Sequence, residues 1–348
     1  MRQEQWEVFK KAARLEKLDE IPFALIIDSP WIPGYLGIKH MDYYLDPELW
    51  FRSNVKIHQE FPDIIFVPSW WMEYGMAAEP SALGSKIKFW QDNTPSEYHT
   101  LYHIEDIESF PEYEVENDAF MAMTLHRIRS QRQRILDLGE ILPIVTSRGP
   151  LCTAGFVRGT TDFMIDLVEK PEWAHKLIDL CTNLIIDWLK AQHKAMGDTV
   201  EGIFILDDIV GFINEDHYLE FAHPYLKKIC DAFPDDWVKI YHNDAEVDAC
   251  LDHLPDCGFN VLNWGKQTDI AEVKDRVGAR MCLMGNVNPL EIGVRGTPEE
   301  VYDATLEVLE KSQGEGIILS VGGGTSPGMP RENIVAMQKA LKTFNMNR

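Results

Sequence analysis

Short, nearly uninterrupted apolar runs recur along the chain, separated by longer segments with helical periodicity. The eight runs cover residues 22–27, 64–67, 141–145, 202–206, 238–241, 260–262, 281–284 and 316–319. Such runs are typical of parallel strands covered on both faces, and the amphipathic segments between them predict helices. No glycine-rich dinucleotide fingerprint follows any of these runs. The pattern therefore predicts an α/β protein with a (β/α)8 TIM barrel.

Helix boundaries are marked clearly in the second half of the chain. Pro171 begins a long amphipathic helix, and Asn214 is a candidate N-cap for a helix over 215–233. Thr297, followed by Pro298 and by Glu300, forms the pattern of a capping box. These signals place helices before the fourth, fifth and eighth predicted strands.

The least regular region runs from residue 69 to about residue 117 and contains several Gly and Pro residues. Within it, residues 86–90 and 98–102 are predicted to pair as a hairpin, inserted after the second strand of the barrel and joined by residues 92–95. No linker or repeat divides the chain. We therefore expect a single domain over residues 1–348.

Composition and charge narrow the classes of partner. The chain has 45% hydrophobic residues and a formal net charge of −23, with 56 acidic residues against 33 Lys and Arg. This balance disfavours binding to nucleic acid or to anionic membranes. The first residues contain no apolar signal segment, no run approaches 18 apolar residues, and the six cysteines show no C-x-x-C spacing. These features favour a cytoplasmic protein with reduced thiols.

Polar and aromatic residues gather after the predicted strands, where a barrel would place its active site. The segment 238–246 is the most informative, because an imidazole, an amide and two carboxylates emerge there within five positions. The candidates at the strand ends are Asp28, Ser29, Ser69, Trp70, Trp71, Glu73, Ser147, Arg148, Gly149, Asp207, Asp208, His242, Asp244, Asn263, Trp264, Asn286, Asn288 and Gly322 to Gly324. Asp208 is preferred to Asp207 for the pocket, although alternation alone leaves the register open.

Several segments together resemble the uroporphyrinogen decarboxylase superfamily, which also contains zinc- and corrinoid-linked methyltransferases. In chain order they are DEIP at 19–22, GPLCTA at 149–154, LDD at 206–208, FAHPYLK at 221–227, the strand ending at His242, MGNVNP at 284–289, GTPEEV at 296–301 and PGMPREN at 327–333. Each segment is short, but their order spans nearly the whole chain. The resemblance implies a (β/α)8 barrel.

The methyltransferase branch is the better match. The Arg-rich motif with which uroporphyrinogen decarboxylases hold substrate carboxylates is missing after the first strand, where residues 28–34 read DSPWIPG. The methyltransferases bind zinc through H-x-C after the fifth strand and a Cys after the eighth. Here Asp244 and Gly323 stand at the two Cys positions, and only His242 matches. His242 and Asp244, joined by Asp208 or Glu73, could still hold zinc through nitrogen and oxygen.

The resemblance implies transfer of a methyl group between a small methylated substrate, such as a methyl ether or methylamine, and a corrinoid protein. His242, Asp244 and Asp208 are expected to hold a metal or a proton near the leaving atom. Asn286 and Arg148 are expected to help orient the substrate. Trp70, Trp264 and Gly323 are expected to contact the cofactor. The superfamily includes dimers, so a homodimer is consistent with the resemblance.

Two alternatives remain open from the residues alone. A decarboxylase or lyase of a small acid would use the same barrel mouth without a corrinoid. A non-catalytic protein that binds a corrinoid or another tetrapyrrole would explain the changed zinc pattern directly. His242 could also be a structural histidine bonded to a neighbouring carboxylate.

Overall fold

Eight parallel strands form the centre of the fold. The computed structural model describes residues 1–348 except 28–29, 111 and 266, so the predicted site residues Asp28 and Ser29 lie outside the described residues. The parallel strands are β1 (Ala24–Ile26), β2 (Ile65–Val67), β5 (Ile144–Arg148), β6 (Gly202–Leu206), β7 (Val238–Asn243), β8 (Val261–Trp264), β9 (Cys282–Val287) and β10 (Ile317–Val321).

The strands follow one another in chain order. Strands β5 to β10 make a six-stranded parallel sheet, β1 pairs with β2, and a parallel bridge from Phe23 to Leu319 links β1 to β10. Among the described residues no strand pairing joins β2 to β5, which would close the ring. Instead the Trp71 ring lies 6.0 Å from the Phe204 ring. The structure therefore shows the predicted parallel α/β class and strand order.

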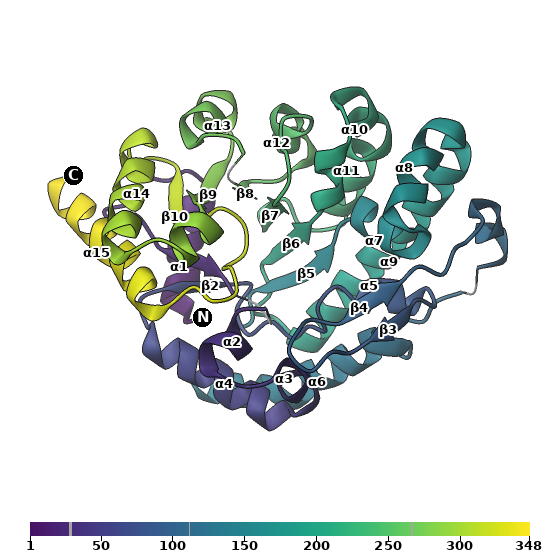
Figure 1. Ribbon diagram of the computed structural model, residues 1–348, viewed down its shortest axis with the longest axis horizontal. Coiled ribbons are helices and arrows are strands. Elements are labelled where there is room, and N and C mark those ends of the chain that lie inside the picture. The colour runs from purple at the N-terminus through teal and green to yellow at the C-terminus, as the bar shows by residue number, and fades with distance from the viewer. Residues whose placement is uncertain (28–29, 111, 266) are drawn as a thin grey trace.

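Helices cover the outside of the sheet, and Figure 1 shows α8 to α15 as an outer arc around β5 to β10. The longer ones are α1 (Gln3–Ala13), α4 (Pro47–Glu60), α6 (Ala119–Asp137), α7 (Pro150–Arg158), α8 (Thr160–Glu169), α9 (Pro171–Met196), α11 (His223–Asp231), α13 (Ile270–Val277), α14 (Pro298–Lys311) and α15 (Arg331–Asn347). The shorter ones are α2 (Ile32–Leu36), α3 (His40–Leu45), α5 (Ala78–Ala82), α10 (Glu215–Phe221) and α12 (Leu254–Cys257).

The predicted helix starts agree with the structure. Pro171 is the first residue of α9, and the Asn214 side chain accepts a hydrogen bond from the His217 amide at the start of α10. Thr297 and Glu300 form a capping box at α14. The helix expected over 215–233 is instead two helices, α10 and α11, because Pro224 cannot donate the backbone bond that a continuous helix needs there.

Two layers of apolar side chains show which face the apolar strand residues occupy. Alternate residues such as Phe204, Val238 and Ile240 pack in the cluster enclosed by the strands, whereas Ile205 and Tyr241 pack against the helices. Because side chains alternate with period two, residues that continue the first set point inward at the strand ends. This register directs His242 inward.

Several strands extend further than the apolar runs predicted. The third run, at 141–145, is shifted, since β5 spans Ile144–Arg148 and includes three polar residues at its end. Likewise β7 reaches Asn243 and β9 reaches Val287. Polar side chains at the carboxyl ends of the strands interrupt the apolar pattern, but the hydrogen bonds between the strands continue. Arg148, His242 and Asn286 therefore lie within the strands.

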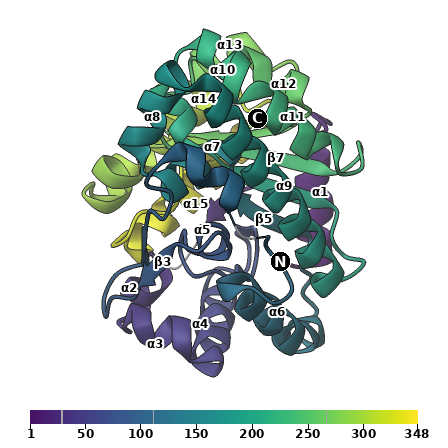
Figure 2. The ribbon, with the colours of Figure 1, turned by 90° about the vertical axis from the view of Figure 1, so that its right-hand side faces the viewer.

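An antiparallel pair follows β2, with β3 (Lys86–Lys88) against β4 (Ser96–Tyr98). The prediction of a second strand over 98–102 is wrong in position, because Tyr98 ends the strand. The amides of Thr100 and Leu101 instead donate to the Val157 carbonyl at the end of α7. Figure 2 shows β3 on the side of the molecule that carries α2, α3 and α5.

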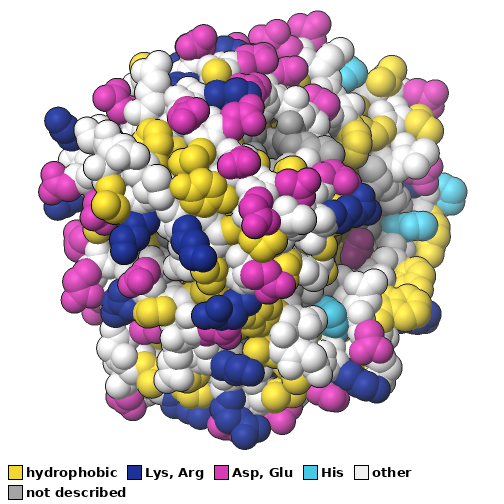
Figure 3. All heavy atoms as spheres, turned by 60° about the vertical axis from the view of Figure 1, so that its left-hand side comes forward, with side chains coloured by type: hydrophobic (Ala, Val, Ile, Leu, Met, Phe, Trp, Pro, Cys, Tyr) yellow, Lys and Arg dark blue, Asp and Glu magenta, His cyan; other side chains and the backbone are white. Residues whose placement is uncertain are grey.

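The surface carries charges of both signs. On the face drawn in Figure 3, Lys and Arg side chains are interspersed with Asp and Glu. Among the described residues, no helix combines the length and the apolar character that crossing a membrane would require.

Candidate functional site

A pocket of about 240 Å³ opens at the carboxyl ends of the strands. Its apolar walls come from Ile26, Met76, Leu206 and Pro327. Its polar lining includes Glu73, Thr94, Arg148, Asp208, His242, Asp244, Thr325 and Ser326. The pocket thus brings together the predicted site residues Glu73, Arg148, Asp208, His242, Asp244 and Gly324, in the place where parallel α/β enzymes hold their substrates.

His242, on β7, is held in one orientation by Asn263 on β8. The imidazole is 4% exposed, and its Nδ1 atom lies 2.7 Å from Asn263 Oδ1. The Asn263 amide nitrogen donates to the carbonyls of Met284 and Val321, at 2.7 Å and 3.2 Å. Because those bonds fix Oδ1 as the atom facing the ring, His242 Nδ1 must carry the proton and donate it. The other nitrogen, Nε2, is left for the pocket.

Two carboxylates face His242 Nε2. Asp208 Oδ1 lies 3.8 Å away and Asp244 Oδ2 lies 3.6 Å away. Burial of the ring lowers the pKa of His242. The charge and hydrogen bond of Asp244, the charge of Asp208 and the hydrogen bond of Asn263 raise it by more, so that the pKa is raised to about 9. The imidazole is therefore cationic at neutral pH, with a proton on Nε2.

The two carboxylates are themselves connected. The Asp244 backbone amide donates to Asp208 Oδ1 at 2.7 Å, so the loop after β7 is tied to the end of β6. Partial burial raises the pKa of Asp244. The positive charge of His242 and its hydrogen bond lower it by more, so the pKa of Asp244 lies below its ordinary value. Asp244 is thus an anion held against a cation, while its side chain stays 54% exposed.

The adjacent Asp207 has a separate structural role. Its fully buried carboxylate accepts from the amides of Leu151 at 3.2 Å and Cys152 at 2.7 Å, in the first turn of α7. Burial raises the pKa of Asp207 to about 7 despite these bonds. Asp208 lines the pocket and Asp207 does not, which is the division between the two that was expected from the sequence.

Gly323, on the loop after β10, lies directly against the Asp244 side chain. A Cβ added to Gly323 would lie 1.8 Å from Asp244 Oδ1, and the glycine has a φ of +93°. The carboxylate therefore fills the space in which a side chain at position 323 would start. Gly323 contributes room for Asp244, whereas the sequence predicted that it would contact a cofactor.

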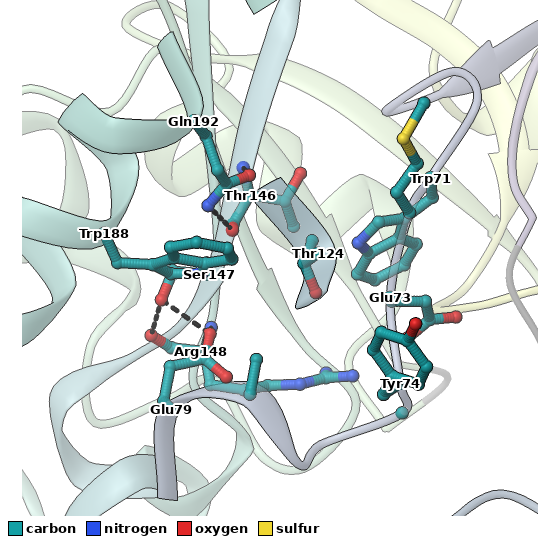
Figure 4. A pocket seen from close by; sticks show the side chains of 13 residues that line it. Trp71, Glu73, Tyr74, Glu79, Thr124, Thr146, Ser147, Arg148, Trp188 and Gln192 are labelled. Atoms are coloured by element: carbon teal, nitrogen blue, oxygen red, sulfur yellow. Dashed lines mark hydrogen bonds between the residues drawn. The ribbon is translucent and has the colours of Figure 1, made fainter. Parts of the chain in front are cut away.

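Arg148, the last residue of β5, places a buried cation in the same pocket. Its backbone amide donates to Glu79 Oε1 at 2.9 Å, and the Ser147 hydroxyl donates to the same oxygen at 2.8 Å. Figure 4 shows the Arg148 side chain extending away from Glu79 toward Glu73 and Tyr74, beside a second cavity of about 30 Å³. Burial lowers the pKa of Arg148, but Glu73, Glu79 and Asp208 raise it overall.

Trp264, Trp70 and Asn286, which were also predicted site residues, do not line the pocket. Trp264 is buried on the helix side of β8, where Nε1 donates to the Thr268 carbonyl at 2.9 Å. Trp70 is buried against Phe51, with Nε1 donating to Glu140 Oε2 at 2.6 Å. Neither ring lines the pocket, because Trp264 points to the helices and Trp70 packs against Phe51. Asn286 donates to the Thr268 carbonyl at 3.2 Å, so its amide supports the loop after β8.

The sequence interpretation assigned Asn263 no specific role beyond its place at a strand end, and it did not single out Glu79. Asn263 stands at a strand end, but its role depends on its neighbour across the strands, which a linear pattern does not show. Glu79 lies in the irregular region, where no periodic signal singles it out. Its carboxylate is buried and fixes the end of β5 through the bonds described above.

Parallel strands with a polar pocket at their carboxyl ends are the arrangement in which many α/β enzymes hold their substrates. The chain belongs to the uroporphyrinogen decarboxylase family, because the model described as "Uroporphyrinogen decarboxylase (URO-D)" matches residues 6–344.

Within this family the similarities extend to both branches. The chain is 28% identical over 250 residues to the methylcobamide:CoM methyltransferase MtbA of Methanosarcina acetivorans, covering 71% of this chain and 70% of that protein. It is 27% identical over 184 residues to a uroporphyrinogen decarboxylase of Chlorobaculum tepidum, a match that covers 51% of this chain and 50% of that protein.

Solved structures show the same fold. A methyltransferase from Methanosarcina mazei aligns with a TM-score of 0.83 and 21% identity, covering 97% of both chains. A B12-independent methionine synthase from Shewanella sp. W3-18-1 aligns with a TM-score of 0.61 and 11% identity, covering 94% of this chain and 97% of that one. These similarities place the chain in a fold used by methyltransferases.

The thiolate zinc site implied by the resemblance does not fit the residues present. Of its three ligands only His242 remains, and Asp244 occupies the space at Gly323. The six cysteines are buried, and none lines the pocket in the described part of the chain. Across the described residues, no three His, Cys, Asp or Glu side chains are grouped so as to hold a metal ion. The metal set predicted from the sequence, His242, Asp244 and Glu73, is therefore not supported.

Proposed function

We propose that this chain is a methyltransferase that moves a methyl group between a small methylated substrate and the cobalt of a corrinoid protein. Family membership and the similarity to a methylcobamide:CoM methyltransferase support the reaction class. The observation that carries the proposal is the environment of His242. One ring nitrogen is fixed as a donor to Asn263, and the other faces the pocket between two carboxylates.

The chemistry of demethylation explains why such a histidine is useful. When a methyl ether or methylamine loses its methyl group, the electron pair of the broken bond stays on the oxygen or nitrogen. A leaving oxygen must then gain a proton. His242, cationic at neutral pH because its pKa is about 9, donates the Nε2 proton to that atom. General acid catalysis of this kind contributes roughly 10²–10⁴-fold in rate. The corrinoid, when its carrier protein docks, supplies the cobalt that takes the methyl group.

Asp208 and Asp244 keep the acid charged without taking its proton. Each carboxylate stabilises the imidazolium from one side, and the lowered pKa of Asp244 keeps that group ionised. Asn263 holds the ring so that only Nε2 faces the pocket. Arg148 orients the substrate from β5. Asp208, Asp244, Asn263 and Arg148 thus support His242 and the substrate through their side chains.

The proposal favours substrates that carry the methyl group on oxygen or nitrogen over reactions that activate a thiol. Thiolate-bound zinc suits the activation of a thiol, and the two Cys positions of that site hold Asp244 and Gly323 here. A protonated imidazole suits a leaving oxygen directly. We further propose that the strands close as a (β/α)8 barrel in a single domain over residues 1–348, with the β3–β4 pair as an insertion after β2. The alignment with the Methanosarcina mazei methyltransferase over 97% of both chains supports this.

A decarboxylase of a small acid is the second candidate, and the buried Arg148 favours it. A guanidinium could hold the carboxylate of such an acid, and His242 could protonate the carbanion left after CO₂ departs. This reaction uses the same residues but needs no corrinoid.

One set of assays separates these functions. The protein is treated with chelator and incubated with methyl ethers and methylamines, with and without reduced cobalamin, while cobalamin absorbance and CO₂ release are followed. Methyl transfer that requires cobalamin and is lost in His242→Ala is expected. CO₂ release without cobalamin would support the decarboxylase. Cobalamin binding with neither reaction would indicate a non-catalytic binding protein. Activity that appears only after zinc is added would contradict the role given to His242.

A further inference from the structure

The guanidinium of Arg148 is buried, and within the described part of the chain it has no hydrogen-bonding or ion-pair partner. The residue as a whole is 9% exposed. The bonds to Glu79 use the Arg148 backbone amide and the Ser147 hydroxyl, so Glu79 stabilises the strand end and leaves the guanidinium's donors free. The Trp71 ring centroid lies 5.8 Å from the guanidinium carbon. Because Arg148 lines the pocket, these donors are available to a ligand that enters it.

Arg148 and His242 lie in one layer of the sheet. Arg148 is in register with Leu206 on β6, and Leu206 is in register with His242 on β7. Neighbouring strands are about 4.8 Å apart, so the two Cα atoms are separated by roughly 10 Å. Both side chains line the same pocket. One small molecule can therefore contact the guanidinium at one end and the imidazole at the other.

The pocket limits what that molecule can be. Its volume of about 240 Å³ corresponds to roughly eight water molecules at about 30 Å³ each, which suits a small substrate. A guanidinium offers a planar pair of donors that matches a carboxylate. The carboxylates of Glu73, Glu79 and Asp208 act on Arg148 through space, so a ligand with several anionic groups would be repelled.

We propose that the substrate carries a single carboxylate, which Arg148 binds through its guanidinium while the methyl-bearing atom lies at His242 Nε2. This rests on the proposed function and names its substrate class: a small methoxy or methylamino monocarboxylate. A porphyrinogen with many carboxylates is excluded by the same argument. Arg148 is then a binding residue that sets specificity.

The test measures binding in the absence of a corrinoid, so methyl transfer is not needed. A short series of methoxy carboxylates of increasing length is compared with the corresponding uncharged amides by calorimetry. We expect at least one carboxylate to bind tighter than its amide by roughly ten-fold or more. Arg148→Met should abolish the difference, and Arg148→Lys should keep part of it, because lysine is cationic but lacks the planar fork.

Arg129→Gln is the matched control, since Arg129 pairs with Glu116 on the surface. Its binding should equal that of the parent, and thermal unfolding confirms that each variant is folded. The inference is overturned if no carboxylate outbinds its amide, or if folded Arg148→Met retains the preference. Carboxylate preference without methyl transfer to reduced cobalamin would keep this inference and reject the proposed function. Methyl transfer from neutral ethers, with no preference for carboxylates over amides, would keep the proposed function and reject this inference.

Discussion

Asp244 occupies the space that any side chain at Gly323 would need. The ideal Cβ position of Gly323 lies 1.8 Å from Asp244 Oδ1, and the same carboxylate faces His242 Nε2 at 3.6 Å through its other oxygen. The glycine and the aspartate are therefore interdependent. A larger residue at 323 must either displace the loop or push the carboxylate away from the histidine.

This relationship predicts a coupling that can be measured. Gly323→Ala should destabilise the protein in the parent but much less when Asp244→Ala removes the obstructing carboxylate. What remains in that background is the strain of a φ of +93° on alanine, on the order of 1 kcal/mol. Unfolding by urea of the four proteins gives the coupling free energy, expected at about 1 kcal/mol or more. Strictly additive effects would show that the two residues do not interfere.

The pH dependence of activity should follow His242. Its pKa is raised from 6.5 to about 9, so the proton it donates is present below that value and is lost as pH rises through it. The stabilisation from the charged ring is likewise complete below pH 6.5 and disappears as pH rises through about 9. Asp244→Asn removes a large contribution that raises the pKa of His242. The pH at which the rate falls on the alkaline side should therefore decrease by about 1 pH unit or more.

A surface variant provides the comparison for this experiment. Asp231→Asn removes a carboxylate that pairs with Lys227 on α11, outside the pocket. Its pH profile should coincide with that of the parent. If Asp244→Asn also leaves the alkaline limb in place, then another group limits the rate and His242 is not the acid.

The prediction of strands from the sequence worked because both faces of this parallel sheet are apolar. The prediction fell short at the strand ends, where inward polar residues such as Arg148 continue the ladder but break the apolar run. Side chains alternate between two faces, and the sequence alone does not say which face is enclosed. Trp264 and Asn263 are neighbours in the chain, yet the structure directs the first to the helices and the second to His242.

Asn263 should act as a positioning residue for His242. Asn263→Ala removes the acceptor for Nδ1, so activity should fall roughly 10–100-fold, and the ¹⁵N spectrum of the imidazole should lose its fixed Nδ1 proton. Asn263→Asp keeps an acceptor for the ring but places an oxygen against the carbonyls of Met284 and Val321. That variant should be less stable than Asn263→Ala. An unchanged imidazole spectrum in Asn263→Ala would refute the positioning role.

Asp207 should matter for stability through α7. Asn at this position keeps one acceptor but turns a donor toward one of the two helix amides, at Leu151 or Cys152. The expected loss is about 1–3 kcal/mol of unfolding free energy at pH 7, measured by urea denaturation. The pH optimum of the folded variant should stay that of the parent. A stability equal to the parent would mean that α7 does not depend on this carboxylate.

The dependence of His242 variants on the leaving group tests the central claim most directly. Methyl transfer to reduced cobalamin is measured in the parent and in His242→Gln, with a methoxy carboxylate and with a trimethylammonio carboxylate of equal length. The ammonium donor leaves as a neutral amine and needs no proton. General acid catalysis predicts a loss of roughly 10²–10⁴-fold for the ether and only a few-fold loss for the ammonium compound. Equal losses for both donors, or transfer from neither by the parent, would contradict the account.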